Sequence, residues 1–111
     1  MILPSRVIFA DKKIKRAFFK LKKGKYEDKR LYELLERAFK DIEEDAFSTT
    51  HIPKDRIPAE YKKKYGIDNL WKYDLPNGWR LLYSVARKEL IVVSIVIEWY
   101  KHSKYERRFG Y

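Results

Sequence analysis

Cations and weak acids gather in the last third of the sequence. Lys72 and Arg80 lie in a segment that reads as a β-hairpin, and His102 and Tyr105 lie in the tail that follows it. These residue types suit metal-free RNA cleavage, in which the 2′-hydroxyl attacks its own phosphate. One group must accept a proton, another must protonate the leaving 5′-oxygen, and cations must stabilise the phosphorane. The residues therefore indicate phosphodiester chemistry on RNA without a cofactor.

Each side chain fits one part of that reaction. Arg80 could hold the phosphate with its planar guanidinium, and Lys72, one strand away, could supply a second cation. His102 is the best single choice for the general acid or base, because histidine titrates near neutrality. Tyr105 could assist proton transfer if nearby cations favour its ionised form. Further substrate contacts are predicted for Lys54, Arg56, Arg107 and Arg108.

Some of these residues have alternative, structural roles. Arg80 and Asp74 could form a cross-strand salt bridge, which would neutralise Arg80. A histidine in a basic tail is often only a solvated side chain, and the lysine run at 62–64 is more often an exposed surface than a binding site. On a basic background that run could still contact RNA nonspecifically. For Arg80 a phosphate role is preferred.

Composition narrows the choice of partner. The 111 residues carry 26 Lys and Arg against 16 Asp and Glu, a formal net charge of +10. Such a field attracts polyanions, so nucleic acid is the first expected partner and an acidic protein segment is the second. The absence of cysteine excludes disulfides and thiolate metal sites, and the two histidines lie too far apart in sequence to suggest a metal cluster. We expect neither metal nor cofactor.

Length and hydropathy predict a single cytoplasmic domain over residues 1–111. The chain is long enough for one core, and 45% of its residues are hydrophobic. The longest apolar run, residues 90–97, is far below the roughly 20 residues of a membrane-spanning helix. The N-terminus lacks the pattern of a signal peptide.

The first half of the chain predicts a strand followed by two helices. Residues 6–10 are β-branched and aromatic, and Asp11 can cap a helix that ends near Gly24. A second helix is predicted over residues 27–46 from its apolar stripe. The short joint predicts an antiparallel helical hairpin that covers one face of a sheet. Residues 48–66 contain two prolines and read as a loop with one helical turn at most.

The second half predicts a three-stranded antiparallel meander. The strands are expected at residues 70–75, 79–85 and 90–100, because the links between them are too short for anything but antiparallel pairing. Residues 90–97 are apolar at both odd and even positions. That strand must therefore lie centrally in the sheet or be covered on both faces. The predicted fold is α+β, with one small sheet and the helices on one face.

The turn at residues 76–78 decides which side chains meet across the hairpin. The Asn-Gly pair alone could form a two-residue turn. The preceding proline, however, has the φ needed at the first corner of a type I turn, and the glycine can be the left-handed residue of a three-residue loop. This longer loop pairs Asp74 with Arg80 and Lys72 with Leu82. It places the charged residues on one face and the aromatic residues on the other.

The hairpin also carries a family resemblance. The strand Leu-Trp-Lys-Tyr-Asp-Leu at 70–75 and the stretch Gly-Trp-Arg-Leu-Leu-Tyr at 78–83 resemble the hairpin of the RelE/ParE superfamily of toxins, as does the predicted order of elements. Members similar to RelE cleave mRNA in the ribosomal A site, whereas ParE-like members poison gyrase. The resemblance matches Lys72 and Arg80 to the family's hairpin cations. It leaves His102 and Tyr105 in the C-terminal segment where many members carry His or Tyr.

Together these observations predict a toxin-type endoribonuclease. We expect it to cleave mRNA on the ribosome by 2′-hydroxyl attack, and to be neutralised by an antitoxin with an acidic or extended segment. One alternative is a ParE-like toxin that acts on gyrase. The other is a catalytically inactive basic module that only binds nucleic acid.

Overall fold

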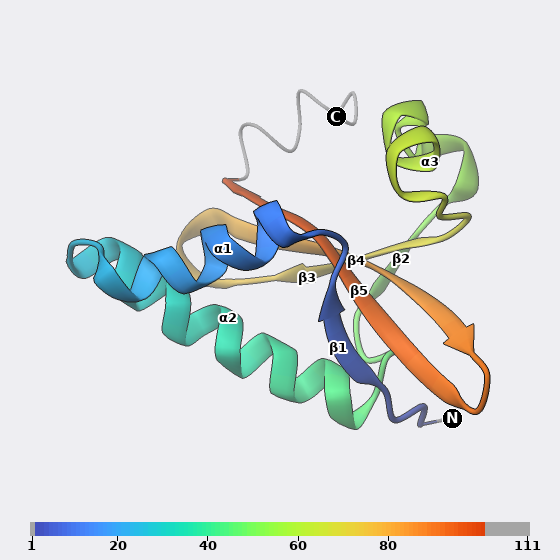
Figure 1. Cartoon of the computed structure of the whole chain (residues 1–111), viewed down its shortest axis with the longest axis horizontal. Helices are drawn as coiled ribbons and strands as arrows, with labels where there is room; N and C mark the ends of the chain where they lie inside the picture. Colours follow the sequence, from blue (N-terminus) through green and yellow to red (C-terminus); the bar gives the residue numbers. More distant parts are fainter. Residues whose placement is uncertain (1, 102–111) are drawn as a thin grey trace.

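The chain folds around β5 (Ile91–Lys101), its most apolar strand, in a computed structural model that describes residues 2–101. The strands form one five-stranded mixed sheet in the order β1-β5-β4-β3-β2 (Figure 1). Inside it, β5 pairs in parallel with β1 (Arg6–Phe9) and antiparallel with β4 (Trp79–Lys88). The strand therefore has a neighbour on each side, as expected of a strand that must lie inside the sheet or be covered on both faces, and its apolar residues on both faces are the physical reason.

The far side of the sheet holds one strand more than the sequence predicted. Next to β4 lies β3 (Leu70–Asp74), and β2 (Thr50–Ile52) pairs antiparallel with β3. The expected loop at 48–66 thus contributes a strand, so the predicted strand count is wrong. The predicted α+β class is confirmed.

The first face of the sheet is covered by α1 (Lys12–Lys20) and α2 (Tyr26–Glu44), joined through the short 3₁₀ turn η1 (Leu21–Lys23). Asp11 caps α1 as predicted, because its carboxylate accepts the Ile14 N–H at 2.8 Å. The shared core of this face joins these helices to β4 and β5. Its buried members include Phe18, Leu31, Leu35, Phe39, Leu81, Tyr83 and Val96.

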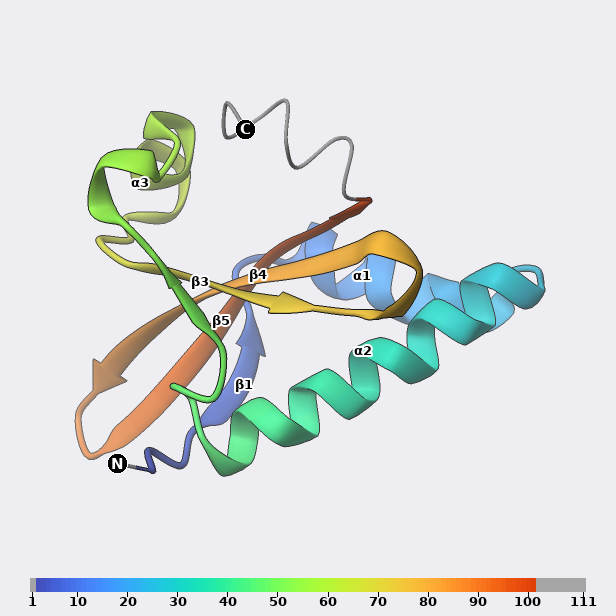
Figure 2. The ribbon, with the colours of Figure 1, turned by 180° about the vertical axis from the view of Figure 1, so that it is seen from behind.

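The second face is covered as well, which contradicts the prediction that all helices lie on one face. The segment after β2 forms the 3₁₀ turn η2 (Lys54–Arg56) and α3 (Ala59–Tyr65), and Figure 2 shows α3 well apart from α1 and α2. A second apolar cluster attaches this segment to the sheet. It comprises Ile52, Ile57, Tyr61, Ile67, Leu70, Leu82, Ile97 and Tyr100. The apolar residues of this segment are spaced irregularly around its prolines, so periodicity gave no helical signal.

The hairpin between β3 and β4 has the predicted register. Lys72 pairs with Leu82 and Asp74 with Arg80, and the loop is closed by the Leu75 N–H donating to the Trp79 carbonyl. The detail of the turn differs from the type I prediction: within η3 (Pro76–Gly78), Asn77 as well as the glycine has a positive φ. A left-handed asparagine at this corner is tolerated because its short polar side chain carries little strain there.

A β-bulge adjusts the end of β5. Leu82 pairs with Glu98 and Tyr83 with Val96, so Ile97 is the extra residue. Val96 packs into the core of the first face, whereas Ile97 packs into the cluster of the second. With the bulge, β5 contributes side chains to both apolar clusters. The bulge also decides toward which face of the sheet the residues after Ile97 point.

Tyr83 ties the loop after α2 to the sheet. Its hydroxyl donates to the Ala46 carbonyl at 2.7 Å and lies 2.6 Å from the Thr49 hydroxyl oxygen. The ring is fully buried, and this burial raises the pKa of Tyr83 to about 12.

We expect Tyr83 to make the fold sensitive to alkali. Its pKa is about 10 in the unfolded chain and about 12 in the folded protein, so its stabilising contribution is complete below about pH 10 and is lost as the pH rises toward about 12. Urea unfolding across this range should give a shallower alkaline loss of stability for Tyr83→Phe than for the wild type. Tyr26→Phe is the matched control, since Tyr26 is 81% exposed. An equal alkaline loss in wild type and Tyr83→Phe would contradict the assignment.

Candidate functional site

Two rows of side chains cross the second face of the sheet. The register of β3, β4 and β5 sets the residues of each row directly opposite one another on neighbouring strands, where Cβ atoms lie about 5 Å apart. One row comprises Glu98, Leu82 and Lys72, and the other comprises Tyr100, Arg80 and Asp74. Strand alternation thus brings the predicted residues Lys72 and Arg80 onto one face, opposite α1 and α2.

Arg80 is held by an ion pair. Its Nε lies 2.8 Å from Asp74 Oδ1, and the Arg80 side chain is 17% exposed whereas that of Asp74 is 60% exposed. The cross-strand salt bridge that the sequence allowed between Asp74 and Arg80 is therefore formed. A phosphate that binds Arg80 must share the guanidinium with Asp74 or displace the Asp74 carboxylate. An ion pair with so exposed a carboxylate contributes only about 0–1 kcal/mol to the stability of the fold.

Lys72 has acidic surroundings. It lines a depression of about 490 Å³ beside the C-terminal part of α2, together with four carboxylates. These belong to Asp41, Glu44, Asp45 and Asp74. The Leu3 and Phe47 backbone N–H groups donate to Asp45 and hold its pKa below the usual value. Such a depression repels phosphate, so Lys72 is a weaker phosphate ligand than its position in the strand indicates.

A hydrogen-bonded network adds three residues that the sequence analysis missed. The Tyr61 hydroxyl donates to Glu98 Oε2 at 2.6 Å and lies 2.6 Å from the Tyr100 hydroxyl. Burial, followed by the bond to Glu98, raises the pKa of Tyr61, which keeps this hydroxyl protonated. Both tyrosines are buried, and Glu98 is partly exposed. One signal was readable: Glu98 is the single acidic residue in β5.

Glu98 also borders a cavity of about 330 Å³. The cavity lies between α1, α3 and the end of β5, beyond the last residue of β5 that pairs with β1. Tyr65 and Trp99 are among the aromatic residues that line it. A planar group can enter such a site against aromatic walls while a carboxylate contacts its polar edge.

The remaining predicted residues divide into two groups. Lys54 and Arg56 lie in η2, exposed, on the segment that covers the second face. The other group lies outside the described residues and comprises His102, Tyr105, Arg107 and Arg108.

The last described residue, Lys101, pairs with Trp79, and its ammonium lies 5.1 Å from the centre of the Trp79 ring. The end of β5 therefore lies opposite Trp79, the residue next to Arg80 on the neighbouring strand.

Two further findings concern residues 2–101. No three His, Asp or Glu side chains in this part of the chain are arranged as a metal site would require. No helix in this part is both long enough and apolar enough to cross a membrane. Asp41, one of the α2 carboxylates, instead accepts a hydrogen bond from the Tyr73 hydroxyl.

If Arg80 binds phosphate, Asp74 competes with that phosphate. We expect Asp74→Asn to tighten binding of a single-stranded RNA several-fold and to steepen the salt dependence, since one more cation becomes available at about 0.7 units of log-log slope. Fluorescence anisotropy over a salt series measures both effects. Glu36→Gln makes the same charge change at an exposed position of α2. An equal gain in the two variants would show that Arg80 does not contact the ligand.

Comparison with known proteins adds no relative to this geometry. No family model, curated protein or solved structure matches the chain. The toxin-family resemblance of the hairpin therefore stays a prediction from the sequence.

Proposed function

We propose that the protein is a toxin-type endoribonuclease that cleaves mRNA by metal-free attack of the 2′-hydroxyl. The observation that carries the proposal is the hairpin register, which sets Arg80 and Lys72 on one face beside the end of the strand that leads to His102. The net charge of +10 supports a polyanionic substrate. Glu98 supplies a carboxylate on the same face.

In the proposed reaction, Arg80 binds the scissile phosphate and stabilises the charge that develops on its oxygens. Phosphate binding displaces Asp74 from the guanidinium. His102 or Glu98 accepts the proton of the 2′-hydroxyl, and His102 or Tyr105 returns a proton to the 5′-oxygen as it leaves. Tyr61 and Tyr100 act as positioning residues, because the Tyr61 hydroxyl donates to Glu98 and the Tyr100 hydroxyl contacts that of Tyr61.

The proposal extends to the partners and the family. A RelE-like arrangement, action on the ribosome in the cytoplasm and neutralisation by an antitoxin follow from the sequence resemblance. An antitoxin segment with carboxylates would compete for the cations of the site, as Asp74 does within the chain. Lys54, Arg56, Arg107 and Arg108 are proposed contacts to the RNA beyond the scissile phosphate.

A second candidate is a basic module that binds nucleic acid without cleaving it. The observation that favours it is the ion pair of Arg80 with Asp74, together with the carboxylates around Lys72. In such a protein the carboxylates would keep phosphate away from Arg80 and Lys72, and the affinity for nucleic acid would depend on other cations. A gyrase-directed toxin remains the third candidate, and inhibition of gyrase supercoiling without RNA cleavage would identify it.

Substitutions at the site distinguish these candidates. We expect Arg80→Ala and His102→Ala each to lower the cleavage rate by about 10² or more, because electrostatic stabilisation and general acid-base catalysis each contribute about that factor. Arg87→Ala is the matched control, since it removes a cation from the same strand outside the two rows. Comparison of Glu98→Gln with His102→Ala identifies the proton acceptor. Tyr105→Phe tests whether that hydroxyl transfers a proton.

The products test the mechanism directly. Attack by the 2′-hydroxyl leaves a 2′,3′-cyclic phosphate or its hydrolysis product, which mass spectrometry of the fragments detects. A substrate with a single 2′-deoxynucleotide at the cleavage position should resist, because it lacks the nucleophile. Cleavage of that substrate at the normal rate would exclude this mechanism.

A further inference from the structure

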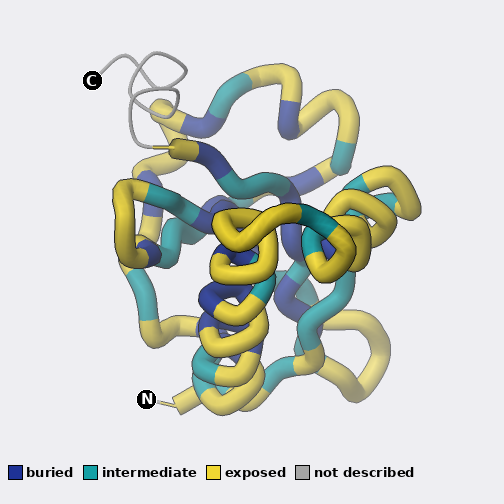
Figure 3. Tube along the Cα trace, turned by 90° about the vertical axis from the view of Figure 1, so that its left-hand side faces the viewer, coloured by how far each residue is buried: buried dark blue, intermediate teal, exposed yellow. Residues whose placement is uncertain are grey.

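The longest stretch of cations without an acidic residue lies on α1 and η1, outside the two rows of side chains that form the hairpin site. Between residues 12 and 25, eight of the fourteen residues are Lys or Arg and none is Asp or Glu. They are Lys12, Lys13, Lys15, Arg16, Lys20, Lys22, Lys23 and Lys25, and all are exposed. We call this α1–η1 surface the basic face. Figure 3 looks onto this end of the molecule and shows its helices largely exposed.

Within residues 2–101, the structure shows no carboxylate in an ion pair with the basic face. Arg30 pairs with Glu33 and Arg80 with Asp74, and neither pair involves the basic face. The hairpin site contrasts with it, because Lys72 lines its depression together with four carboxylates. The eight cations of the basic face therefore attract a polyanion that approaches α1 and η1.

An aromatic ring lies in the middle of these cations. Phe19 is a large apolar residue of α1 and is 45% exposed, whereas the adjacent Phe18 is buried. It borders a shallow hollow of about 370 Å³ whose other lining residues are Lys15, Arg16, Lys20 and Lys23. These residues are one, three or four positions from Phe19, so the helix sets them around the ring. Cations around an exposed ring suit an unpaired nucleotide, with phosphates on the cations and the base on the ring.

A membrane is a poorer occupant of this surface. An interfacial helix must bury a continuous apolar face in the lipid. The apolar side of α1 is already in use: Phe18 is buried, and Ile14 and Leu21 pack against the same core. Only Phe19 remains as an exposed large apolar side chain on α1.

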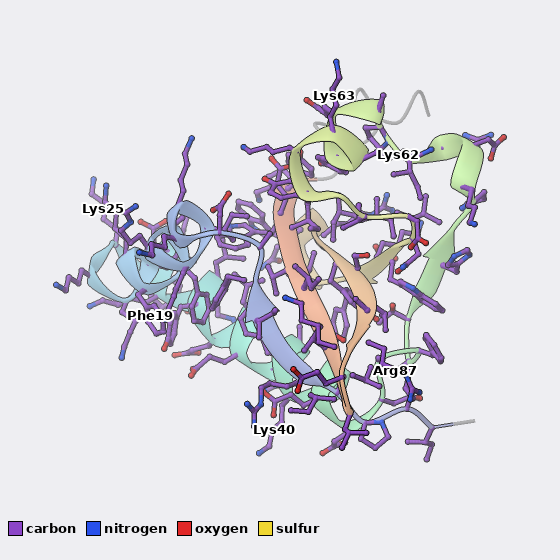
Figure 4. The ribbon with its side chains drawn as sticks, turned by 45° about the vertical axis from the view of Figure 1, so that its right-hand side comes forward. Phe19, Lys25, Lys40, Lys62, Lys63 and Arg87 are labelled. Carbon is purple, nitrogen blue, oxygen red and sulfur yellow. The ribbon has the colours of Figure 1, made fainter. Side chains whose placement is uncertain are left out.

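We propose that the basic face is a docking surface for single-stranded RNA, separate from the cleavage site on the hairpin. The lysines and Arg16 bind successive phosphates, and Phe19 stacks on an unpaired base. The proposal takes from the proposed function only that RNA is the partner. Figure 4 shows Phe19 and Lys25 at one end of the molecule, away from Lys62 and Lys63 on α3 and from Lys40 and Arg87.

The test compares charge removal at two places. The docking variant is Lys15→Ala/Lys20→Ala/Lys23→Ala, and alanine preserves the helix. The control variant Lys40→Ala/Arg87→Ala/Lys88→Ala removes the same charge elsewhere. The probe is a fluorescent single-stranded RNA whose 2′-O-methyl groups prevent cleavage. We expect the docking variant to lose about tenfold or more in affinity and about 2 units of log-log salt slope, at about 0.7 per lost phosphate contact, and the control to lose far less.

Phe19→Leu tests the ring without changing charge. Leucine keeps apolar bulk over the neighbouring phenylalanines but cannot stack, so affinity for the single strand should fall by on the order of tenfold while affinity for a duplex stays unchanged. An equal loss for both ligands would remove the stacking role from Phe19.

The outcomes separate docking from cleavage. RNA binding that depends on the basic face supports the docking surface even if unmodified RNA is not cleaved, which would overturn the proposed function alone. Equal loss in the docking and control variants overturns the docking surface, whether or not RNA is cleaved. It is also overturned if the docking variant abolishes binding to anionic phospholipid vesicles and leaves RNA binding intact.

Discussion

The structure depends on the need to bury β5 on both faces. Its apolar residues alternate between two clusters, and the bulge at Ile97 lets neighbouring residues serve each of them. The helical pair α1–α2 can cover only one face, so the segment at 50–67 must cover the other. At about 25 cal/mol per Å² of apolar surface, leaving the side chains of the second cluster in water would cost a large part of the stability of a domain of this size.

That second cover also shapes the candidate site. Because α3 packs on the face that carries Arg80, its Tyr61 meets Glu98 and Tyr100, and the cavity beside Glu98 forms between α1 and α3. A sheet covered by α1 and α2 alone would have left the apolar side chains of the second cluster exposed beside the charged ones. The covered sheet holds the Glu98 carboxylate by a hydrogen bond at the border of a partly open cavity.

Cations and carboxylates are distributed unevenly over the surface of residues 2–101. Four carboxylates line the same depression as Lys72, and one of them, that of Asp74, pairs with Arg80. The basic face, in contrast, has no acidic residue within it. Long-range attraction and local chemistry can therefore be carried by different surfaces. If RNA binds the proposed docking surface, the hairpin meets that RNA at a raised local concentration.

The sequence by itself determined the local features: the cap at Asp11, the apolar stripe of α2, the apolar residues of β5 on both faces and the hairpin register that pairs Asp74 with Arg80. Each follows from spacing within a few residues, where propensity and turn chemistry act. Only the tertiary structure decided the rest. Strand β2 and helix α3 are short and lack a regular period, so packing against the sheet selects them. Tyr61 and Glu98, which share a hydrogen bond, are more than twenty positions apart in the sequence, and so are Lys72 and the three carboxylates at positions 41, 44 and 45 that line its depression. Local pattern carries no information about such encounters.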